Sequence, residues 1–255
     1  VAISRMRGDA IELYSQGQGV YEDQRQIALI LNLPVDKINV VLVPNGGGFG
    51  GKEDLSVQGH CALMSFTTGK TVKLSLNREE SIRMSVKRHP LWMDYRVGCD
   101  SKGKLKFVKA NILGDTGAYA SVGMKVLERA AGHATGAYNV PCVDVEAKSV
   151  YTNNLPCGAM RGFGANQATF ALESCIDELC EKGGFDRWQF RYENALTEGC
   201  QTSTGQKLSS GVGVRQTLES LKDVFQSAKY AGIACGIKNT GIGNGMPDSS
   251  KVKIY

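Results

Sequence analysis

Apolar residues recur along this chain with two different spacings, which predict helices and strands in alternation. Between Asn166 and Leu179 they repeat at every third and fourth position, which predicts a helix that ends at Gly183-Gly184. Similar patterns predict helices over 22–31, 55–66 and 214–225. In the last of these helices, Leu218, Leu221 and Val224 are predicted to face the core.

Strand patterns occupy much of the remaining chain. The apolar run 38–43 has the length of a strand that is buried on both faces. Shorter runs predict strands over 11–14, 71–76, 143–147 and 233–239. A hairpin that turns at 100–103 is predicted to place Met93, Tyr95 and Val97 opposite Leu105 and Phe107. Hairpins mixed with helices predict an α+β fold of mixed sheets and packed helices.

Composition narrows the class of protein. Of the 255 residues 42% are hydrophobic and 22% charged, so the chain can bury a sizeable core, and its length suggests one large domain over 1–255 or two modest ones. The net charge is only +5 and five basic residues never run together, which disfavours a nucleic-acid partner. No window holds 18 apolar residues, so we expect no membrane partner. The chain begins at Val1 and ends in a strand-like run, which suggests a fragment.

Cysteine and histidine are placed without a metal-binding pattern. The eight cysteines form no C-x-x-C pair, which disfavours zinc-ribbon and iron–sulfur sites in this chain. A chain of this size does not need disulfides, so we expect reduced thiols and a cytoplasmic location. The three histidines are scattered, and we expect no metal held directly by the protein.

A glycine cluster, GGGFGGKE (46–53), is the first candidate functional site. Gly46 to Lys52 fits the G-x-x-x-x-G-K pattern of phosphate-binding loops, with a strand before it and a predicted helix after it. A nucleotide-binding loop has Ser or Thr after the lysine to hold magnesium, whereas this chain has Glu53, whose charge would repel phosphates. The glycines instead predict a backbone that a bulky anionic ligand can approach closely.

A second glycine segment, 161–167, lies before the strongest helix pattern. It combines Arg161, Phe163 and a helix N-terminus, a combination that suits an anionic ligand with a flat ring. A third segment, 239–245, has no apolar helix after it and fails as a dinucleotide fingerprint.

Five segments are together typical of one enzyme family. They are GGGFGGKE (46–53), GDTGAYAS (114–121), ERAAGHATGAYNVP (128–141), YTNN (151–154) and AMRGFGANQ (159–167). The chain thereby resembles the molybdenum-cofactor subunit of the xanthine dehydrogenase and aldehyde oxidase family of molybdenum hydroxylases. Three further segments are most similar to the bacterial purine-type members of this family, the xanthine dehydrogenases and hypoxanthine oxidases. These segments are SQGQGV, KVLERAAGHA and ACGIKNTGIGNGMPD.

The resemblance implies a role for each residue of the cofactor site. Gln18 would donate a hydrogen bond to a ligand of the molybdenum. Gly48, Phe49 and Gly50, through their backbone, and Arg161 would contact molybdopterin, which is expected as the cytosine dinucleotide. Iron–sulfur clusters and FAD are expected on other domains or subunits.

The resemblance also implies a substrate site and a reaction. Glu53 and Arg129 would hold a purine from opposite sides, and Phe163 would stack on it. A metal-bound hydroxide would attack an electron-poor ring carbon, with hydride transfer to the metal centre, so an arginine at the ring oxygen would stabilise the developing charge. The general-base glutamate of the family is expected outside this chain.

The resemblance also implies which part of the enzyme this chain represents, and it leaves other substrates and other functions open. The chain is expected to be the N-terminal half of a molybdopterin-binding domain, without the preceding domain and the C-terminal half, and to be inactive by itself. An aldehyde or a nicotinate-like heterocycle is the alternative substrate. A phosphate-loop nucleotide binder and a non-catalytic scaffold are the alternative functions.

Overall fold

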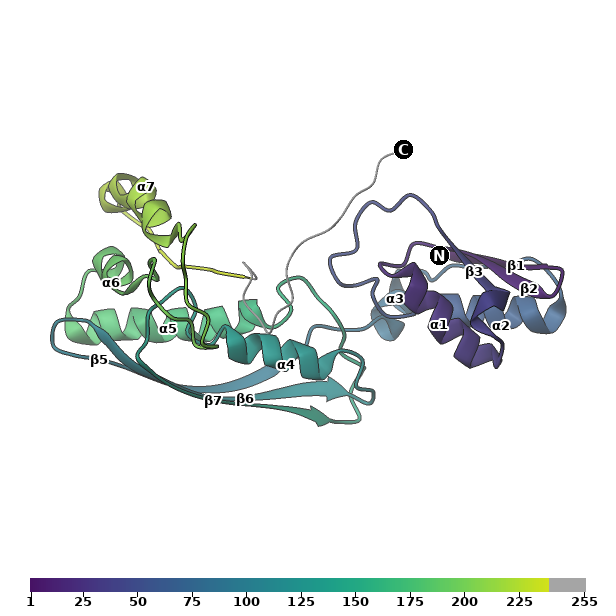
Figure 1. The fold of residues 1–255 in the computed structure, drawn as a ribbon, viewed down its shortest axis with the longest axis horizontal. Coiled ribbons are helices and arrows are strands. Elements are labelled where there is room, and N and C mark those ends of the chain that lie inside the picture. Colours follow the sequence, from purple (N-terminus) through teal and green to yellow (C-terminus); the bar gives the residue numbers. More distant parts are fainter. Residues whose placement is uncertain (239–255) are drawn as a thin grey trace. The chain divides into compact units, whose positions relative to one another are not determined.

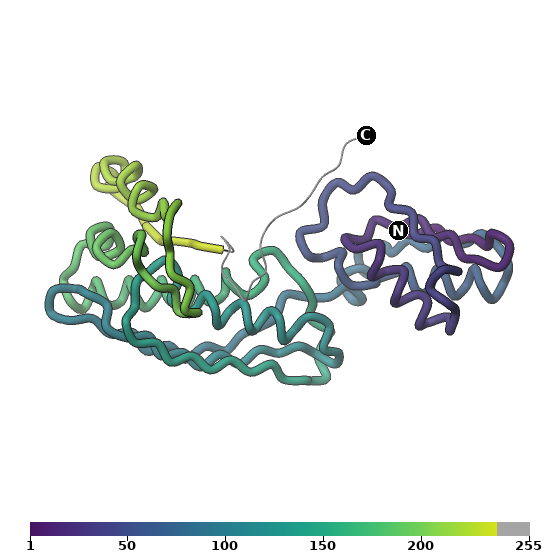
Figure 2. The backbone as a smooth tube through the Cα atoms, viewed as in Figure 1, coloured from purple at the N-terminus to yellow at the C-terminus, as the bar shows by residue number. Residues whose placement is uncertain are grey.

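The computed structural model describes residues 1–238, which form two compact units that are described separately. Unit 1 comprises Val1–His89, Asp115–Gly123 and Tyr151–Arg161. Unit 2 comprises Pro90–Gly114, Met124–Val150 and the described residues from Gly162 onward. The path of the chain therefore enters and leaves each unit more than once (Figure 2).

Unit 1 is built on a four-stranded mixed sheet in the order β3-β2-β1-β4. The strands are β1 (Ala2–Arg7), β2 (Ala10–Ser15), β3 (Ile38–Leu42) and β4 (Val72–Leu74). β1 pairs antiparallel with β2 and β4, whereas β2 and β3 are parallel. The strands predicted over 11–14, 38–43 and 71–76 are confirmed. The apolar pattern does not indicate β1, because a buried serine, Ser4, lies between Ala2 and Met6 on its core face.

Helices cover one face of this sheet (Figure 1). They are α1 (Val20–Leu31) and α2 (Gln58–Thr68). Unit 1 also contains α3 (Arg78–Met84) and a short 3-10 turn, η1 (Val35–Lys37). Ile11 and Leu13 of β2 pack against Ile27 of α1 and Cys61 of α2, and all four side chains are fully buried. The helix predicted over 22–31 is confirmed, and it ends at Asn32 in the left-handed conformation.

The prediction that residues 38–43 are buried on both faces is wrong. β3 is an edge strand, and Leu42 at its end is 54% exposed. The face of the sheet that lies away from the core carries polar side chains, with Arg5 bonded to Glu12 and Tyr14. An apolar run can therefore form an edge strand when its neighbours contribute the polar face.

Unit 2 is built on a three-stranded sheet in the order β5-β6-β7. The strands are β5 (Leu91–Cys99), β6 (Leu105–Gly117) and β7 (Cys142–Tyr151), so the predicted hairpin and the strand at 143–147 are confirmed. A register shift at Gly98 and Cys99 turns Phe107 to the other face, where it is 42% exposed. Val108 takes the core position instead, which corrects the predicted partner of the β5 residues.

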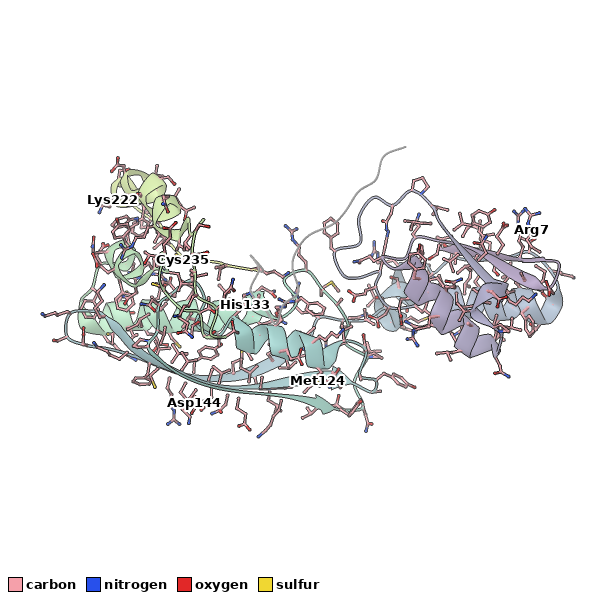
Figure 3. The ribbon with its side chains drawn as sticks, in the orientation of Figure 1. Arg7, Met124, His133, Asp144, Lys222 and Cys235 are labelled. Atoms are coloured by element: carbon pink, nitrogen blue, oxygen red, sulfur yellow. The ribbon has the colours of Figure 1, made fainter. Side chains whose placement is uncertain are left out.

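The two faces of this sheet differ in chemistry. Asp144 on β7 is paired with Lys109 on β6 at 2.6 Å, on the face turned away from the helices (Figure 3). The other face packs against α4 (Gly123–Gly132) and α5 (Ala165–Gly183), and α6 (Arg187–Asn194) and α7 (Val214–Ser227) complete the unit. Leu172 and Ile176 of α5 are fully buried, so the helix predicted up to Gly183-Gly184 is confirmed.

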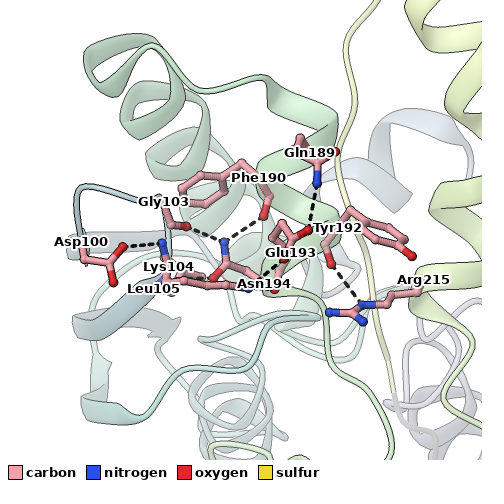
Figure 4. Close-up of polar contacts among 10 residues, drawn as sticks. All are labelled: Asp100, Gly103, Lys104, Leu105, Gln189, Phe190, Tyr192, Glu193, Asn194 and Arg215. Carbon is pink, nitrogen blue, oxygen red and sulfur yellow. Dashed lines mark hydrogen bonds and ion pairs between the residues drawn. The ribbon is translucent and has the colours of Figure 1, made fainter.

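A buried asparagine joins α6 to the β5–β6 turn (Figure 4). The Asn194 amide nitrogen donates to the carbonyl oxygens of Gly103 and Phe190, each at 2.8 Å. Its amide oxygen accepts from the Leu105 N–H at 2.9 Å. These bonds satisfy backbone groups that would otherwise be buried without a partner.

The C-terminal part of unit 2 departs from the sequence prediction. Leu218 of α7 is buried, but Leu221 and Val224 are 52% and 68% exposed, so their predicted inward direction is wrong. Residues 233–238 form no strand, although Cys235 is buried in the core. Asn239 and the glycine segment 239–245 lie outside the described residues.

Candidate functional site

The glycine cluster 46–53 forms a loop in unit 1 between β3 and α2. Its conformation needs glycine at two positions. A Cβ atom at Gly48 would collide with the Gln18 amide, and one at Gly50 would lie 2.8 Å from the carbonyl carbon of Ala159. Phe49 between them has a φ of 53°, a left-handed conformation that L-residues rarely adopt. The loop is therefore folded tightly against two other segments.

Gln18 closes the loop through its amide oxygen. The N–H groups of Gly50 and Lys52 donate to Gln18 Oε1 at 2.9 and 3.2 Å. The Gln18 N–H in turn donates to the Lys52 carbonyl at 2.8 Å. These backbone donors fix which end of the amide faces the loop, so the Gln18 amino group points away from it.

Arg161 and Phe49 bring the two predicted cofactor segments together. The Arg161 N–H donates to the Phe49 carbonyl at 2.8 Å, and the guanidinium lies 5.8 Å from the Phe49 ring centroid. The ring is 67% exposed and Arg161 is exposed as well. An open aromatic ring and a guanidinium therefore lie side by side at this loop.

Lys52 is held inside the loop. Its ammonium group donates to Asn45 Oδ1 at 3.0 Å, and the same oxygen accepts from the Gly47 N–H. α2 begins only at Gln58, whereas the helix of a phosphate-binding loop follows the glycines directly and presents its N-terminus to the phosphates. The structure therefore lacks the helix position that the nucleotide-binding alternative requires, and the prediction of a helix from Leu55 is corrected.

Glu53 follows the loop and is exposed, and its N–H donates to the Gly50 carbonyl at 3.2 Å. The next residue, Asp54, accepts a hydrogen bond from the Ser121 hydroxyl. A Cβ atom at Gly158 would collide with the Asp54 carboxylate. The segment that carries Glu53 is thus fixed against the motif 114–121 and against Gly158, which lies between the motifs 151–154 and 159–167.

Arg129 and Phe163 belong to unit 2, whereas Gln18, Phe49, Glu53 and Arg161 belong to unit 1. Arg129 lies in the last turn of α4 and is half-buried, and Phe163, with a φ of 50°, precedes α5. A Cβ atom at Gly164 would lie 3.0 Å from the Ala130 nitrogen of α4. The structure therefore brings the segments of Arg129 and Phe163 together within unit 2.

Two of the three histidines are buried in the structure. His89 and His133 are 3% and 2% exposed, and burial lowers the pKa of both imidazoles. Within residues 1–238 no group of three or more His, Cys, Asp and Glu side chains could hold a metal ion. The eight cysteines, all within that range, are free thiols.

Among the described helices none is long and apolar enough to cross a membrane.

A buried polar cluster that the sequence patterns did not predict lies next to the turn that carries Gln18. Asp23, Ser15 and Gln58 are 1%, 0% and 5% exposed and are bonded to one another. A signal was present, because Asp23 shares the inward stripe of α1 with Ile27 and Leu31 at a spacing of four residues. A charged residue in such a stripe indicates a buried polar partner.

Comparison with known proteins identifies the family to which this chain belongs. Residues 1–195 match the family model of the molybdopterin cofactor-binding domain. The chain is 45% identical over 206 residues to the nicotinate dehydrogenase large molybdopterin subunit of Eubacterium barkeri, and this match covers 81% of the chain and 48% of that protein. It is 36% identical over 248 residues to a probable xanthine dehydrogenase subunit of Bacillus subtilis, covering 93% of the chain and 33% of that protein.

The fold is similar to that of a solved structure. The aldehyde oxidoreductase of Desulfovibrio gigas superposes with a TM-score of 0.85 at 30% identity, covering 89% of this chain and 25% of that one. The chain thus spans half or less of the length of these relatives. It belongs to the family of molybdopterin cofactor-binding domains, within the xanthine dehydrogenase and aldehyde oxidase group of enzymes.

Proposed function

We propose that this protein forms part of a molybdenum hydroxylase that oxidises a purine-type heterocycle such as xanthine or hypoxanthine. The observation that carries the proposal is the glycine loop closed onto Gln18, in a chain of the molybdopterin-binding family. The bound cofactor supplies the oxygen transfer and accepts the two electrons. The residues of this chain bind and orient the cofactor and the substrate.

The glycine loop fits a large, flat and anionic group such as molybdopterin. Gly48 and Gly50 let the loop fold closely against Gln18 and Ala159, and Phe49 offers an exposed ring. The Arg161 guanidinium beside that ring attracts anions. Gln18 directs its amino group away from the loop, where it can donate to a ligand of the metal. We therefore assign Gln18, Gly48, Phe49, Gly50 and Arg161 to cofactor binding.

Glu53, Arg129 and Phe163 are our candidates for the substrate site. Glu53 would accept hydrogen bonds from the N–H groups of the ring, and Phe163 would stack on it. Arg129 would face the ring oxygen, where it stabilises the negative charge that develops during oxidation. A plain aldehyde offers no ring N–H groups, so desolvating a carboxylate and a guanidinium for it would cost free energy without return.

Nicotinate is the second candidate substrate, because the large molybdopterin subunit of a nicotinate dehydrogenase is 45% identical to this chain. Nicotinate carries a carboxylate, which Arg129 would attract and Glu53 would repel. A purine such as hypoxanthine carries no such group. Removing the charge of Glu53 therefore has opposite effects on the two substrates.

The test is a substrate panel on the complete enzyme, with xanthine, hypoxanthine, nicotinate and an aldehyde, for the wild type and Glu53→Gln. If the substrate is a purine, kcat/KM falls about tenfold or more in Glu53→Gln, since the hydrogen bonds from the ring N–H groups lose their charged acceptor. Nicotinate turnover that is unchanged or faster in Glu53→Gln identifies the second candidate. Absence of molybdenum from the complete wild-type protein leaves only a scaffold role.

The remaining parts of the enzyme follow from the same proposal. We infer that the cofactor is the cytosine dinucleotide form, that a glutamate outside residues 1–255 acts as general base, and that iron–sulfur and flavin domains or subunits carry the electrons away. We also infer a cytoplasmic location, where the eight free thiols stay reduced. Nucleotide analysis of the released cofactor checks its cytosine dinucleotide form. Identification of the subunits that co-purify, with their iron and flavin content, checks the electron-carrying partners.

A further inference from the structure

The buried cluster of Ser15, Asp23 and Gln58 lies directly under the turn that carries Gln18. The Ser15 hydroxyl donates to Asp23 Oδ2 at 2.9 Å and accepts from Gln58 Nε2 at 3.3 Å. The three residues come from the end of β2, the first turns of α1 and the start of α2. The cluster therefore ties three elements of unit 1 together at one point.

The first connection from the cluster leads to Gln18. The Gly17 N–H donates to the Ser15 hydroxyl at 2.9 Å. A Cβ atom at Gly17 would collide with the Asp23 carboxylate, so this carboxylate lies directly against the Gly17 backbone. Ser15 and Asp23 thus fix the peptide that precedes Gln18.

The second connection leads to the segment of Glu53. Gln58 Oε1 accepts from the N–H groups of Ser56 and Val57 at 2.9 and 3.0 Å. At the other end of the same segment, Gln18 Oε1 accepts from the N–H groups of Gly50 and Lys52. The residues from 50 to 57, which include Glu53, are therefore held at one end by Gln58, which donates to Ser15, and at the other by Gln18, which follows the Gly17 N–H bonded to Ser15.

We propose that Ser15, Asp23 and Gln58 are positioning residues, which act through Gln18 and the glycine loop to set the geometry of the cofactor and substrate site. The proposal rests on the function proposed above. None of the three residues is placed in contact with the cofactor or the substrate. Their effect passes through the backbone of Gly17 and of the 50–57 segment.

The chemistry of the cluster fits positioning better than stability alone. A buried carboxyl loses its hydration, and burial raises the pKa of Asp23 above its ordinary value. An apolar side chain at this position of α1 would pack with Ile27 and Leu31 without that cost. What the carboxyl and the Ser15 hydroxyl provide is a directed set of hydrogen bonds next to Gly17.

The main test compares Ser15→Ala with Ser65→Ala in the complete enzyme. Both serines are fully buried in unit 1, and Ser65 donates to the Lys70 carbonyl far along α2 from the loop. We measure amide hydrogen exchange in peptides covering 46–53, the molybdenum content, and kcat and KM separately. In Ser15→Ala we expect exchange in 46–53 to be at least about fivefold faster, because one buried hydrogen bond is lost.

The activity readouts distinguish positioning from general destabilisation. We expect Ser15→Ala to lower molybdenum content or kcat by about fivefold or more, with Ser65→Ala close to wild type in both. Equal exchange rates in 46–53 for Ser15→Ala and Ser65→Ala would overturn the proposal. So would faster exchange in Ser15→Ala without any change in molybdenum content, kcat or KM.

A second pair of variants keeps the test valid if Ser15→Ala folds poorly. Asp23→Asn retains an oxygen that can accept from Ser15, whereas Asp23→Ala does not. We expect wild-type exchange in 46–53 for Asp23→Asn and faster exchange for Asp23→Ala, and identical behaviour of the two excludes Asp23 from positioning. Hydrogen exchange needs no substrate, so a wild-type enzyme without molybdenum or turnover contradicts the proposed function and leaves this comparison of variants intact.

Discussion

Individual side chains in the core of unit 2 differ in how their polar atoms are satisfied. Tyr95 and Tyr138 pack into the same hydrophobic cluster. The Tyr138 hydroxyl donates to Glu173, which also binds the fully buried Arg191. The Tyr95 hydroxyl is buried and has no hydrogen-bond partner among residues 1–238. The same chemical group is therefore stabilising at one position and costly at the other.

This contrast predicts opposite effects of removing the two hydroxyls. Tyr138→Phe removes the donor to one of the two Glu173 carboxylate oxygens, while Arg191 still binds the other, and should lower the free energy of unfolding by about 1–3 kcal/mol. Tyr95→Phe should leave it unchanged or raise it by up to about 1 kcal/mol. Urea denaturation of the chain followed by fluorescence gives both values. A loss of stability in Tyr95→Phe as large as in Tyr138→Phe would mean that Tyr95 has a partner.

The raised pKa of the buried Asp23 carboxyl predicts how the free energy of unfolding changes with pH. Burial raises the pKa of its carboxyl, while the bonds from Ser15 and Gln58 oppose that shift only in part. The unfolded chain therefore loses this proton at lower pH than the folded chain, so Asp23 reduces stability as pH rises from about 4 through its folded pKa. Asp23→Asn removes this titration.

The stability difference between Asp23→Asn and the wild type should accordingly move in favour of the variant as pH is raised. Chemical denaturation of both proteins at a series of pH values from about 3.5 to about 8 measures this difference. A difference that is constant over this range would show that Asp23 titrates alike in the folded and unfolded chain.

At the scale of elements, neighbours decide where a segment lies and where it ends. Residues 38–42 form an edge strand because β2 is their only strand partner in the sheet. α2 begins only at Gln58, because the N–H groups of the two preceding residues, Ser56 and Val57, donate to the Gln58 side chain. Phe107 leaves the core because of a register shift between β5 and β6, in which Cys99 pairs with Leu105 and Gly98 with Phe107. None of these causes lies in the local apolar pattern.

The sheet of unit 1 and its loop depend on different parts of the chain. The core residues of this sheet, from Ala2 to Leu76, all belong to the first 89 residues. The glycine loop, in contrast, packs on Ala159 and bonds to Arg161. We expect a fragment of residues 1–89 to keep protected amides in β2 and α1 while the amides of 47–53 exchange faster than in residues 1–255.

Hydrogen exchange with mass spectrometry of the two polypeptides measures this difference. β2 serves as the internal control, since its partners β1 and β3 are present in both. Equal protection of 47–53 in both polypeptides would contradict a supporting role for the segment around Arg161. Loss of protection in β2 would show that the sheet needs the later segments as well.

At the scale of the whole molecule, each of the two units is built from segments that lie far apart in the sequence. Unit 1 is completed by Asp115–Gly123 and Tyr151–Arg161, which hold the segment around Glu53 and the backbone of Phe49. Arg129 and Phe163 lie in unit 2. The chain also covers only 48% of the nicotinate dehydrogenase large molybdopterin subunit and 25% of the aldehyde oxidoreductase.

We therefore expect residues 1–255 alone to bind the molybdenum cofactor weakly and to be inactive. Elemental analysis of the purified polypeptide, alongside the complete protein prepared in the same host, gives the molybdenum content per chain. Turnover of xanthine or nicotinate is measured in parallel. Stoichiometric molybdenum together with turnover in residues 1–255 alone would contradict this expectation.

The sequence by itself determined the mixed α+β class, the long helix α5, the hairpin of β5 and β6, and the two glycine segments. These features follow from local spacing and from residues, such as glycine, that permit particular backbone conformations. Only the tertiary structure decided that Gln18 locks the loop, that Arg161 lies over Phe49, and that Ser15, Asp23 and Gln58 meet beneath them. Each of those contacts joins segments that are apart in the sequence, and such contacts depend on packing that no local pattern contains.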